Sequence, residues 1–108
     1  MDRFIFGSNE TLHAPHLIDL EIAQVLRRYV LSGMITAERA AGSLAVLVDF
    51  PLTRYPHRLL LNRIWQLRHV LTAYDAAYLA LAEALDAPLV TRDRALAKAG
   101  GRVRVEVL

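Results

Sequence analysis

The 108-residue chain contains no cysteine and a single lysine, and both features narrow what the protein can be. Without thiols it can form neither disulfides nor a zinc site built on thiolates. Arginine supplies nearly all of the positive charge in a formal net charge of +2. Arginine binds phosphates and carboxylates alike, so this composition fits a nucleic acid or an acidic protein partner. A GC-rich coding sequence explains the arginine bias equally well.

Long apolar runs and secretory signals are also absent. No stretch reaches the roughly 18 apolar residues that a membrane span requires, and Met1 is not followed by the basic, apolar and small residues of a signal peptide. We therefore expect a cytoplasmic protein that does not enter the membrane. With 55% hydrophobic residues the chain can bury a core, and its length predicts one domain over residues 1–108. No P-loop, GxGxxG, HExxH or GxSxG motif occurs.

Proline, glycine and threonine mark the boundaries of the predicted elements. Pro15 suits the first turn of a helix, Gly33 a helix C-terminus, and Thr36 and Thr72 two helix N-caps. We predict an extended segment at 12–15, helices at 16–31, 37–47, 56–70, 73–85 and 94–99, and strands at 50–55, 89–91 and 102–108. Strands that alternate with helices imply a parallel sheet in an α/β fold. Trp65 has apolar helical neighbours, which favours a place in the core over a role in base stacking.

Three acids, Glu21, Asp75 and Asp93, interrupt apolar or small-residue surroundings. Glu21 lies beside the apolar face of the first long helix, between Leu17 one turn before it and Val25 one turn after it. Its carboxylate is therefore expected to project along a largely apolar column. Pairing with an arginine such as Arg92 or Arg63 is an alternative explanation for Glu21.

The other two acids lie where helices are predicted to begin. Asp75 falls in the first turn of the helix at 73–85, where the helix dipole stabilises a carboxylate, and it shares the face that should pack on the sheet. Asp93 follows the strand at 89–91, and ligands of open α/β sheets bind beyond the carboxyl ends of strands. An ordinary helix N-cap also explains Asp93. Thr91 is close enough to support either acid by hydrogen bonding.

Together the three acids point to a metal site. Carboxylates gathered near one sheet edge repel each other unless a positive charge lies among them. Mg²⁺ and Mn²⁺ prefer hard oxygen ligands and bind well beside phosphates. Such ions can activate a water molecule for phosphodiester hydrolysis. His13 and His16 are not spaced as a helical metal pair, and we expect them at the surface.

The residues then match a known family. The segments HAPHLIDLEIAQVLRR (13–28) and LTAYDAAYLALAEALDAPLVTRDRAL (71–96) closely resemble the PIN-domain ribonucleases that act as toxins in VapBC toxin-antitoxin pairs. FPLTRYPHRLLLNRIWQLR (50–68) resembles the middle section of the same family. The resemblance implies a three-layer αβα fold with a central parallel sheet.

The resemblance also implies an activity and partners. It implies an endoribonuclease dependent on Mg²⁺ or Mn²⁺, a VapB-type antitoxin whose tail enters the acidic groove, and homodimers. Glu21, Asp75 and Asp93 match the family's acidic positions, the two aspartates as metal ligands and Glu21 as a ligand or water-orienting base. Thr91 would support them. Arg92 and Arg94 are candidates for RNA phosphate contacts, and solvated surface arginines are the alternative explanation.

The chain departs from the family pattern at its start. PIN domains open with a strand that carries an aspartate, and residues 4–6 correspond better to the end of the family's first helix than to that strand. We therefore expect the first strand and helix to be absent, backbone groups in the sheet to be left unpaired, and metal-dependent cleavage to be weak or lost. A late start codon, a truncated remnant or a partner chain that fills the gap would each account for this.

Three functional hypotheses follow. The first is an active ribonuclease toxin. The second is a truncated, catalytically weak remnant that binds antitoxin or dimerises without cleaving RNA. The third is a DNA-binding or regulatory module, which ranks last because no helix-turn-helix spacing is evident.

Overall fold

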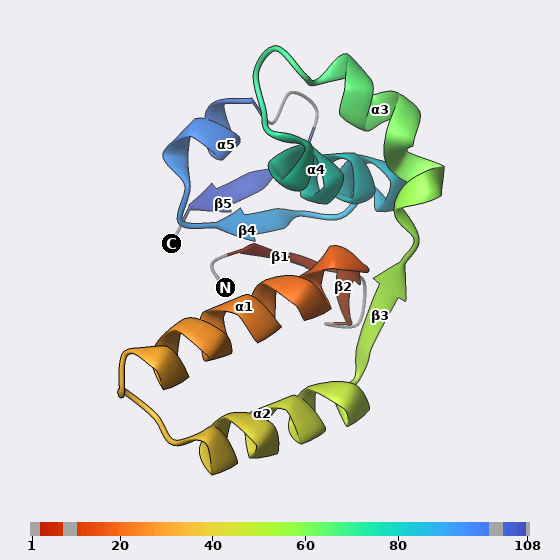
Figure 1. Ribbon diagram of the computed structural model, residues 1–108. Coiled ribbons are helices and arrows are strands. Elements are labelled where there is room, and N and C mark those ends of the chain that lie inside the picture. Colours follow the sequence, from red (N-terminus) through yellow and green to blue (C-terminus); the bar gives the residue numbers. More distant parts are fainter. Residues whose placement is uncertain (1–2, 8–10, 100–102, 108) are drawn as a thin grey trace.

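The computed structural model describes residues 3–7, 11–99 and 103–107, and it has helices on both sides of a five-stranded sheet (Figure 1). Helices α1 and α2 lie on one side of the sheet, and α3, α4 and α5 lie on the other. This arrangement confirms the predicted three-layer αβα class. The strands are β1 (Arg3–Phe6), β2 (Leu12–Pro15), β3 (Leu52–Tyr55), β4 (Leu89–Thr91) and β5 (Val105–Val107). The helices are α1 (Leu17–Leu31), α2 (Ala37–Asp49), η2 (His57–Leu60), α3 (Leu61–Gln66), α4 (Ala73–Leu85) and α5 (Arg94–Lys98).

The centre of the sheet differs from the prediction. The strand order is β3-β2-β1-β4-β5, and the pairs β2 with β3 and β4 with β5 are parallel as expected. Strand β1 lies in the middle and runs antiparallel to both β2 and β4, so the sheet is mixed. The interpretation of residues 4–6 as a helix end is therefore wrong.

A physical reason for this correction is the backbone pairing that a central strand provides. Without β1, the facing edges of β2 and β4 would leave N–H and C=O groups unpaired inside the protein. The sequence RFIF of β1 combines aromatic and β-branched residues that favour strands, and Ile5 is fully buried in the core. The periodicity of so short an apolar segment cannot distinguish a buried strand from part of a buried helix.

Gly7, which follows β1, lies close to the start of β2. The backbone N–H of Gly7 donates to the carbonyl of Thr11 at 2.7 Å. A Cβ atom at position 7 would lie 2.6 Å from Oγ1 of Thr11 and would also collide with the ring of His13. Any larger residue would therefore displace these side chains at the start of β2. The His13 ring also lies within hydrogen-bond distance of the Tyr55 hydroxyl, at 2.7 Å, on the neighbouring strand.

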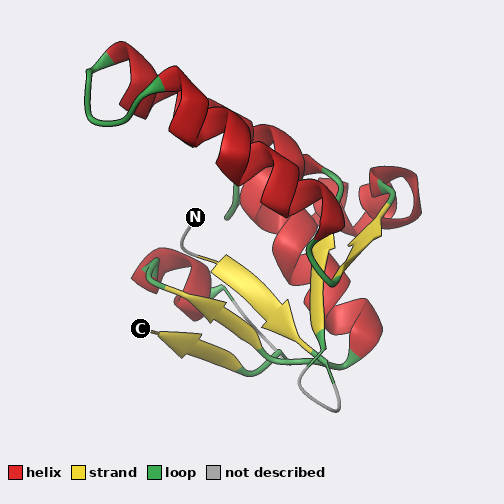
Figure 2. Cartoon of the chain, turned by 90° about the horizontal axis from the view of Figure 1, so that it is seen from below, coloured by secondary structure: helices red, strands yellow, loops and turns green. Residues whose placement is uncertain are grey.

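Helices α1 and α2 form a hairpin that extends beyond the sheet (Figure 2). Gly33 adopts φ of +79° in the connection, as expected for a glycine after a helix C-terminus. The side chain of Thr36 accepts a hydrogen bond from the amide of Arg39, which confirms the predicted N-cap of α2. Arg54 of β3 holds the hairpin to the sheet. Its Nε donates to both carboxylate oxygens of Asp19, at 3.0 and 2.8 Å.

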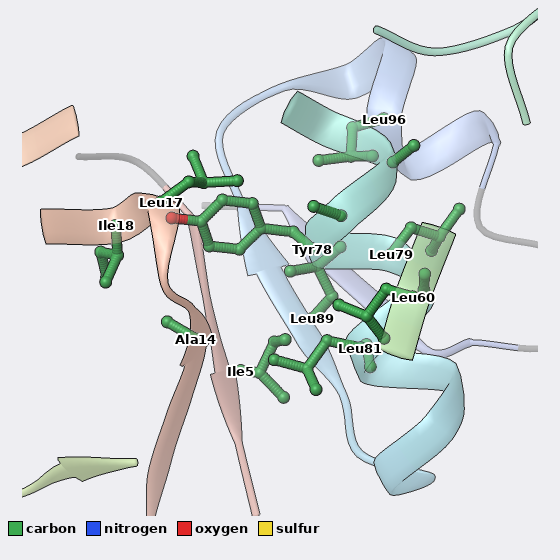
Figure 3. Close-up of a cluster of buried hydrophobic side chains, with 14 of the residues drawn as sticks. Ile5, Ala14, Leu17, Ile18, Leu60, Tyr78, Leu79, Leu81, Leu89 and Leu96 are labelled. Atoms are coloured by element: carbon green, nitrogen blue, oxygen red, sulfur yellow. The ribbon is translucent and has the colours of Figure 1, made fainter. Parts of the chain in front are cut away.

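Helix α4 is the centre of the core (Figure 3). Residues 76–82 are all buried, and four of these seven are alanines. A helix that is apolar on all sides is buried on all sides, and small alanine side chains let the neighbouring elements approach closely. The side chains packed around α4 include Ile5 of β1, Ala14 of β2, Leu60 of η2 and Leu89 of β4. This packing fixes the N-terminus of α4, and with it Asp75, above the sheet.

The helix predicted at 56–70 is shorter and divided. A 3₁₀ turn, η2, precedes α3, which ends at Gln66, and the amide of Leu67 bonds to the carbonyls of both Arg63 and Ile64. Such shared bonds tighten the last turn and end a helix. The placement of Trp65 in the core is also wrong. The residue is 67% exposed, and the guanidinium of Arg68 lies 4.6 Å from the ring centroid. No helix among the described residues has the length and apolar character needed to span a membrane.

Candidate functional site

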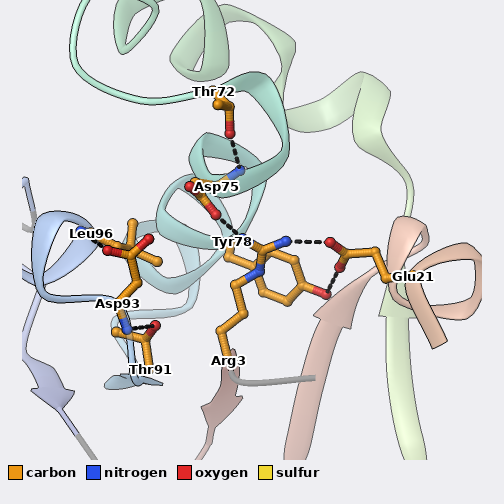
Figure 4. A network of polar contacts seen from close by, with 8 residues as sticks. All are labelled: Arg3, Glu21, Thr72, Asp75, Tyr78, Thr91, Asp93 and Leu96. Carbon is orange, nitrogen blue, oxygen red and sulfur yellow. Dashed lines mark hydrogen bonds and ion pairs between the residues drawn. The ribbon is translucent and has the colours of Figure 1, made fainter. Parts of the chain in front are cut away.

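One arginine joins two of the three predicted acids (Figure 4). Nη2 of Arg3 forms an ion pair with Oε2 of Glu21, and Nη1 forms an ion pair with Oδ1 of Asp75. The three side chains are only 13%, 24% and 19% exposed, respectively, so water screens these pairs less than it would at the surface. Glu21 comes from α1, Asp75 from α4 and Arg3 from β1, so three separate elements converge at this point.

The direction of β1 explains why Arg3 reaches this position. Arg3 pairs with Thr91 in the register between β1 and β4. Because β1 is antiparallel to β4, its first residue lies beside the carboxyl end of β4. The carboxyl ends of strands in α/β sheets are where ligands bind. The reversed strand thus places a guanidinium at the edge of the sheet where the sequence predicts a metal ion.

Tyr78 orients the second oxygen of Glu21. The Tyr78 hydroxyl donates a hydrogen bond to Oε1 of Glu21 at 2.7 Å, and the guanidinium carbon of Arg3 lies 4.4 Å from the centroid of the Tyr78 ring. The phenol is fully buried. Burial is the main cause that raises the pKa of Tyr78 well above its usual range, and the hydrogen bond to Glu21 raises it further.

Asp75 lies in the first turn of α4, as predicted. Thr72 caps this helix, and its side chain accepts a hydrogen bond from the Asp75 amide at 3.2 Å. The negative carboxylate is therefore stabilised by the positive end of the α4 dipole as well as by Arg3.

Asp93 has a different environment. Its Oδ1 accepts a hydrogen bond from the amide of Leu96 at 3.2 Å, which is the helix-capping role that the sequence left open as an alternative. Oγ1 of Thr91 accepts a hydrogen bond from the Asp93 amide at 3.0 Å, so Thr91 supports the backbone of this acid. Among the described residues, the ion pairs of Arg3 are those with Glu21 and Asp75.

A groove leads outward from Glu21. It has a volume of about 590 Å³ and is lined by Arg3, Leu17, Leu20, Glu21, Gln24, Val25, Arg28, Tyr74 and Arg92. Two of the lining residues, Arg28 and Arg92, are exposed arginines, and the Tyr74 side chain is 66% exposed. Arg94 is exposed at the start of α5 and does not line this groove. The groove therefore combines cationic side chains with an exposed aromatic ring beside the acidic site.

Comparison with known proteins identifies the family. The family model of the PIN domain matches residues 2–102. The chain belongs to the PIN-domain family. Among its curated relatives is ribonuclease VapC1 of Mycobacterium tuberculosis, which is 51% identical over 90 residues that cover 82% of this chain and 68% of VapC1. Ribonuclease VapC9 of the same organism is 46% identical over 84% of this chain and 72% of its own length. Ribonuclease VapC12 of the same organism is 36% identical over 85% of this chain and 71% of its own length. These relatives identify the chain as a VapC-type PIN domain.

The described residues of this PIN domain do not fit a divalent ion in the observed arrangement. A divalent ion needs several oxygen ligands around one point. Glu21 uses both oxygens, one with Arg3 and one with Tyr78, and Asp75 contributes Oδ1 to Arg3. Within residues 3–7, 11–99 and 103–107, no group of three or more histidine, cysteine or acidic side chains is placed to hold a metal.

Sequence reasoning missed three residues that shape this PIN-domain site. Arg3 lies in a short segment with no recognisable motif, and its partner role depends on the reversed strand. The position of Tyr78, one helical turn after Asp75, identifies it as a neighbour of that acid, but its hydrogen bond to Glu21 was not predicted. Nε2 of His57 accepts a hydrogen bond from the Leu17 amide at 2.9 Å and so completes the start of α1, the helix that carries Glu21. The proposed partners of Glu21, Arg63 and Arg92, are replaced by Arg3, and Arg63 pairs with Glu83 instead.

Proposed function

We propose that this PIN domain is an endoribonuclease toxin of a type II toxin-antitoxin pair, with its active site around Glu21, Asp75 and Asp93. The observation that carries the proposal is the convergence of Glu21 and Asp75 on one cation at the sheet edge, although the two residues are far apart in the sequence. Carboxylates gathered beside the carboxyl end of β4 suit hydrolysis of phosphodiester bonds. Its VapC-type relatives are ribonucleases, which supports RNA as the substrate class.

The groove beside Glu21 is the proposed path of the RNA. Arg28 and Arg92 can pair with phosphates, and the exposed ring of Tyr74 can stack on a base. RNA single strands are recognised by this combination of cationic and aromatic side chains. Arg94 lies outside the groove, so we assign it a smaller contribution than Arg92. The RNA strand would then run past Glu21 toward the start of α4.

The proposed cofactor is Mg²⁺ or Mn²⁺, and the proposed partner is a VapB-type antitoxin in the cytoplasm, with the toxin as a homodimer. Its place among VapC-type PIN domains supports the divalent ion and the antitoxin, whereas the homodimer and the cytoplasmic location are proposed from the family resemblance alone. Because the carboxylates are paired with Arg3, we expect only weak cleavage from the native chain. A second candidate function is a PIN domain that binds antitoxin without cleaving RNA, and the pairing of both Glu21 and Asp75 with Arg3 favours it.

Cleavage of single-stranded RNA tests the proposal. We expect slow endonucleolytic cleavage that needs Mg²⁺ or Mn²⁺, stops in EDTA and is lost in Asp75→Asn. The matched control is Asp49→Asn at the exposed end of α2, which should cleave like the native chain. Metal-independent cleavage, or cleavage that survives Asp75→Asn, would reject the proposed active site. Absence of cleavage in every variant, together with tight antitoxin binding, would favour the second candidate.

A further inference from the structure

We propose that Arg3 is the resident counter-ion of the Glu21–Asp75 pair and that a divalent ion binds these carboxylates only after Arg3 has left them. The proposal deepens the proposed function, because it describes how access to that same acidic site is controlled. The question is whether Arg3 or a divalent ion is bound to these carboxylates, so metal-binding measurements without RNA can answer it.

The competition follows from the oxygen atoms involved. A metal ion bound between Glu21 and Asp75 would need Oε2 of Glu21 and Oδ1 of Asp75, the atoms that pair with the two terminal nitrogens of Arg3. Oε1 of Glu21 is already held by the Tyr78 hydroxyl. A guanidinium and a divalent ion therefore cannot occupy this point together, since each would place positive charge on the same oxygens.

The backbone holds Arg3 in this position. Arg3 pairs with Thr91 of β4, and its guanidinium lies over the Tyr78 ring. The strand pairing positions the backbone of Arg3, and the ring contact places its guanidinium beside the acids. An arginine over an aromatic face gains further stabilisation from the ring. Arg3 is therefore part of the packing between β1 and α4, unlike an arginine in an exposed surface ion pair.

Two features make the contact reversible. Nε of Arg3 is buried and has no hydrogen-bond partner among the described residues, which is unfavourable for a charged donor. A single positive charge also leaves the two carboxylates under-neutralised, whereas a divalent ion would balance both. Arg3 is the first residue of the four-residue strand β1, where strand ends open most easily. Metal binding and the ion pairs of Arg3 thus oppose each other, and each must weaken the other by the same factor.

Mn²⁺ titration of RNA-free protein tests this coupling. The variants are Arg3→Gln and Arg3→Met, of which the second keeps an apolar stem against Tyr78. The matched control is Arg104→Gln, which removes an exposed arginine that pairs with Glu106 instead of Glu21 or Asp75. We expect both Arg3 variants to bind Mn²⁺ about tenfold or more tightly than the native chain, as measured by electron paramagnetic resonance of the free ion. The control should match the native chain, and adding Glu21→Gln should remove the gained affinity.

A second measurement uses the native chain and keeps the test valid if both Arg3 variants fail to fold. The guanidinium NMR signals of Arg3 should be those of an ion-paired side chain without metal, and any Mg²⁺ that binds at Glu21 should shift them in step with binding. The proposal is overturned if folded Arg3 variants gain no affinity. It is equally overturned if Mg²⁺ saturates Glu21 in the native chain while the Arg3 signals stay unchanged.

The two proposals can fail separately. Arg3 variants that bind Mn²⁺ tightly but never cleave RNA would reject the ribonuclease function and leave the Arg3 competition intact. Native protein that cleaves RNA rapidly with Mg²⁺, with no gain in metal affinity in Arg3→Met, would reject the competition and leave the ribonuclease function intact.

Discussion

The Tyr78 hydroxyl donates a 2.7 Å hydrogen bond to Oε1 of Glu21, across the boundary between α4 and α1. Tyr78 is fully buried, and the carboxylate it binds is mostly buried. This bond therefore joins the core of the domain to its acidic site. It restricts the rotation of the Glu21 carboxylate and leaves Oε2 as the oxygen that faces Arg3.

The first prediction concerns removal of this hydroxyl. Tyr78→Phe should lower the free energy of unfolding by about 1–2 kcal/mol, because it removes a buried hydrogen bond to a charged acceptor while keeping the ring. Urea denaturation measures this change. Tyr29→Phe at an exposed position is the control and should change stability by less than half as much. Equal losses in the two variants would contradict the role given to the Tyr78 hydroxyl.

The second prediction is a loss of stability at alkaline pH. Because the pKa of Tyr78 is raised in the folded state, its neutral form favours folding. That contribution is complete below the ordinary phenol pKa of about 10 and declines as pH rises above it, since the unfolded chain then releases the proton. The free energy of unfolding should fall more steeply above this pH in the native chain than in Tyr78→Phe. Parallel profiles would contradict the prediction.

The fold and the acidic residues were largely predictable, and the exceptions have physical causes. Helix α4 and strand β4 carry strong signals, namely the cap at Thr72, an uninterrupted apolar helix and a short apolar strand before Asp93. The direction of β1 carries no local signal, because antiparallel and parallel neighbours accept the same residues. Its placement depends on the unpaired edges of β2 and β4, which only the assembled sheet reveals.

The acidic site could be predicted only in part, because one of its residues is brought there by the direction of β1. Glu21 and Asp75 were recognisable as carboxylates in apolar surroundings, and they do meet. Which cation lies between them was not predictable, because Arg3 reaches the site only through the reversed strand. Whether Asp93 serves as a metal ligand stays a prediction, since its capping bond to Leu96 is compatible with more than one role.

The third prediction separates two roles of Asp93. Asp93→Ala should lower the free energy of unfolding by about 1 kcal/mol through loss of the α5 cap, whereas Asp93→Asn should preserve stability because asparagine caps helices equally well. If Asp93 is also a metal ligand, RNA cleavage should fall in both variants. Thermal unfolding and the cleavage assay together measure this. Full cleavage by a stable Asp93→Asn protein would leave Asp93 with a capping role only.

The fourth prediction concerns stability of the Arg3 variants. Arg3→Met leaves the Glu21 and Asp75 carboxylates close together without a counter-ion. We expect a loss of about 1–3 kcal/mol in metal-free buffer, less than for a fully buried pair because the groups are partly exposed. Mg²⁺ should restore much of this stability by binding the folded state, and it should change the native chain less. Denaturation with EDTA and with Mg²⁺ measures the difference, and Mg²⁺ effects of equal size in both proteins would contradict it.

The fifth prediction places RNA in the groove beside Glu21. Arg28→Gln and Arg92→Gln should each weaken binding of single-stranded RNA, and each should lower the slope of log affinity against log salt by about 0.7, because one phosphate contact is lost. Arg94→Gln removes the same charge at an exposed position outside the groove and should change the slope less. Binding is measured in EDTA, so that cleavage does not interfere. Equal slopes for the Arg92 and Arg94 variants would indicate that RNA follows net charge and does not lie along this groove.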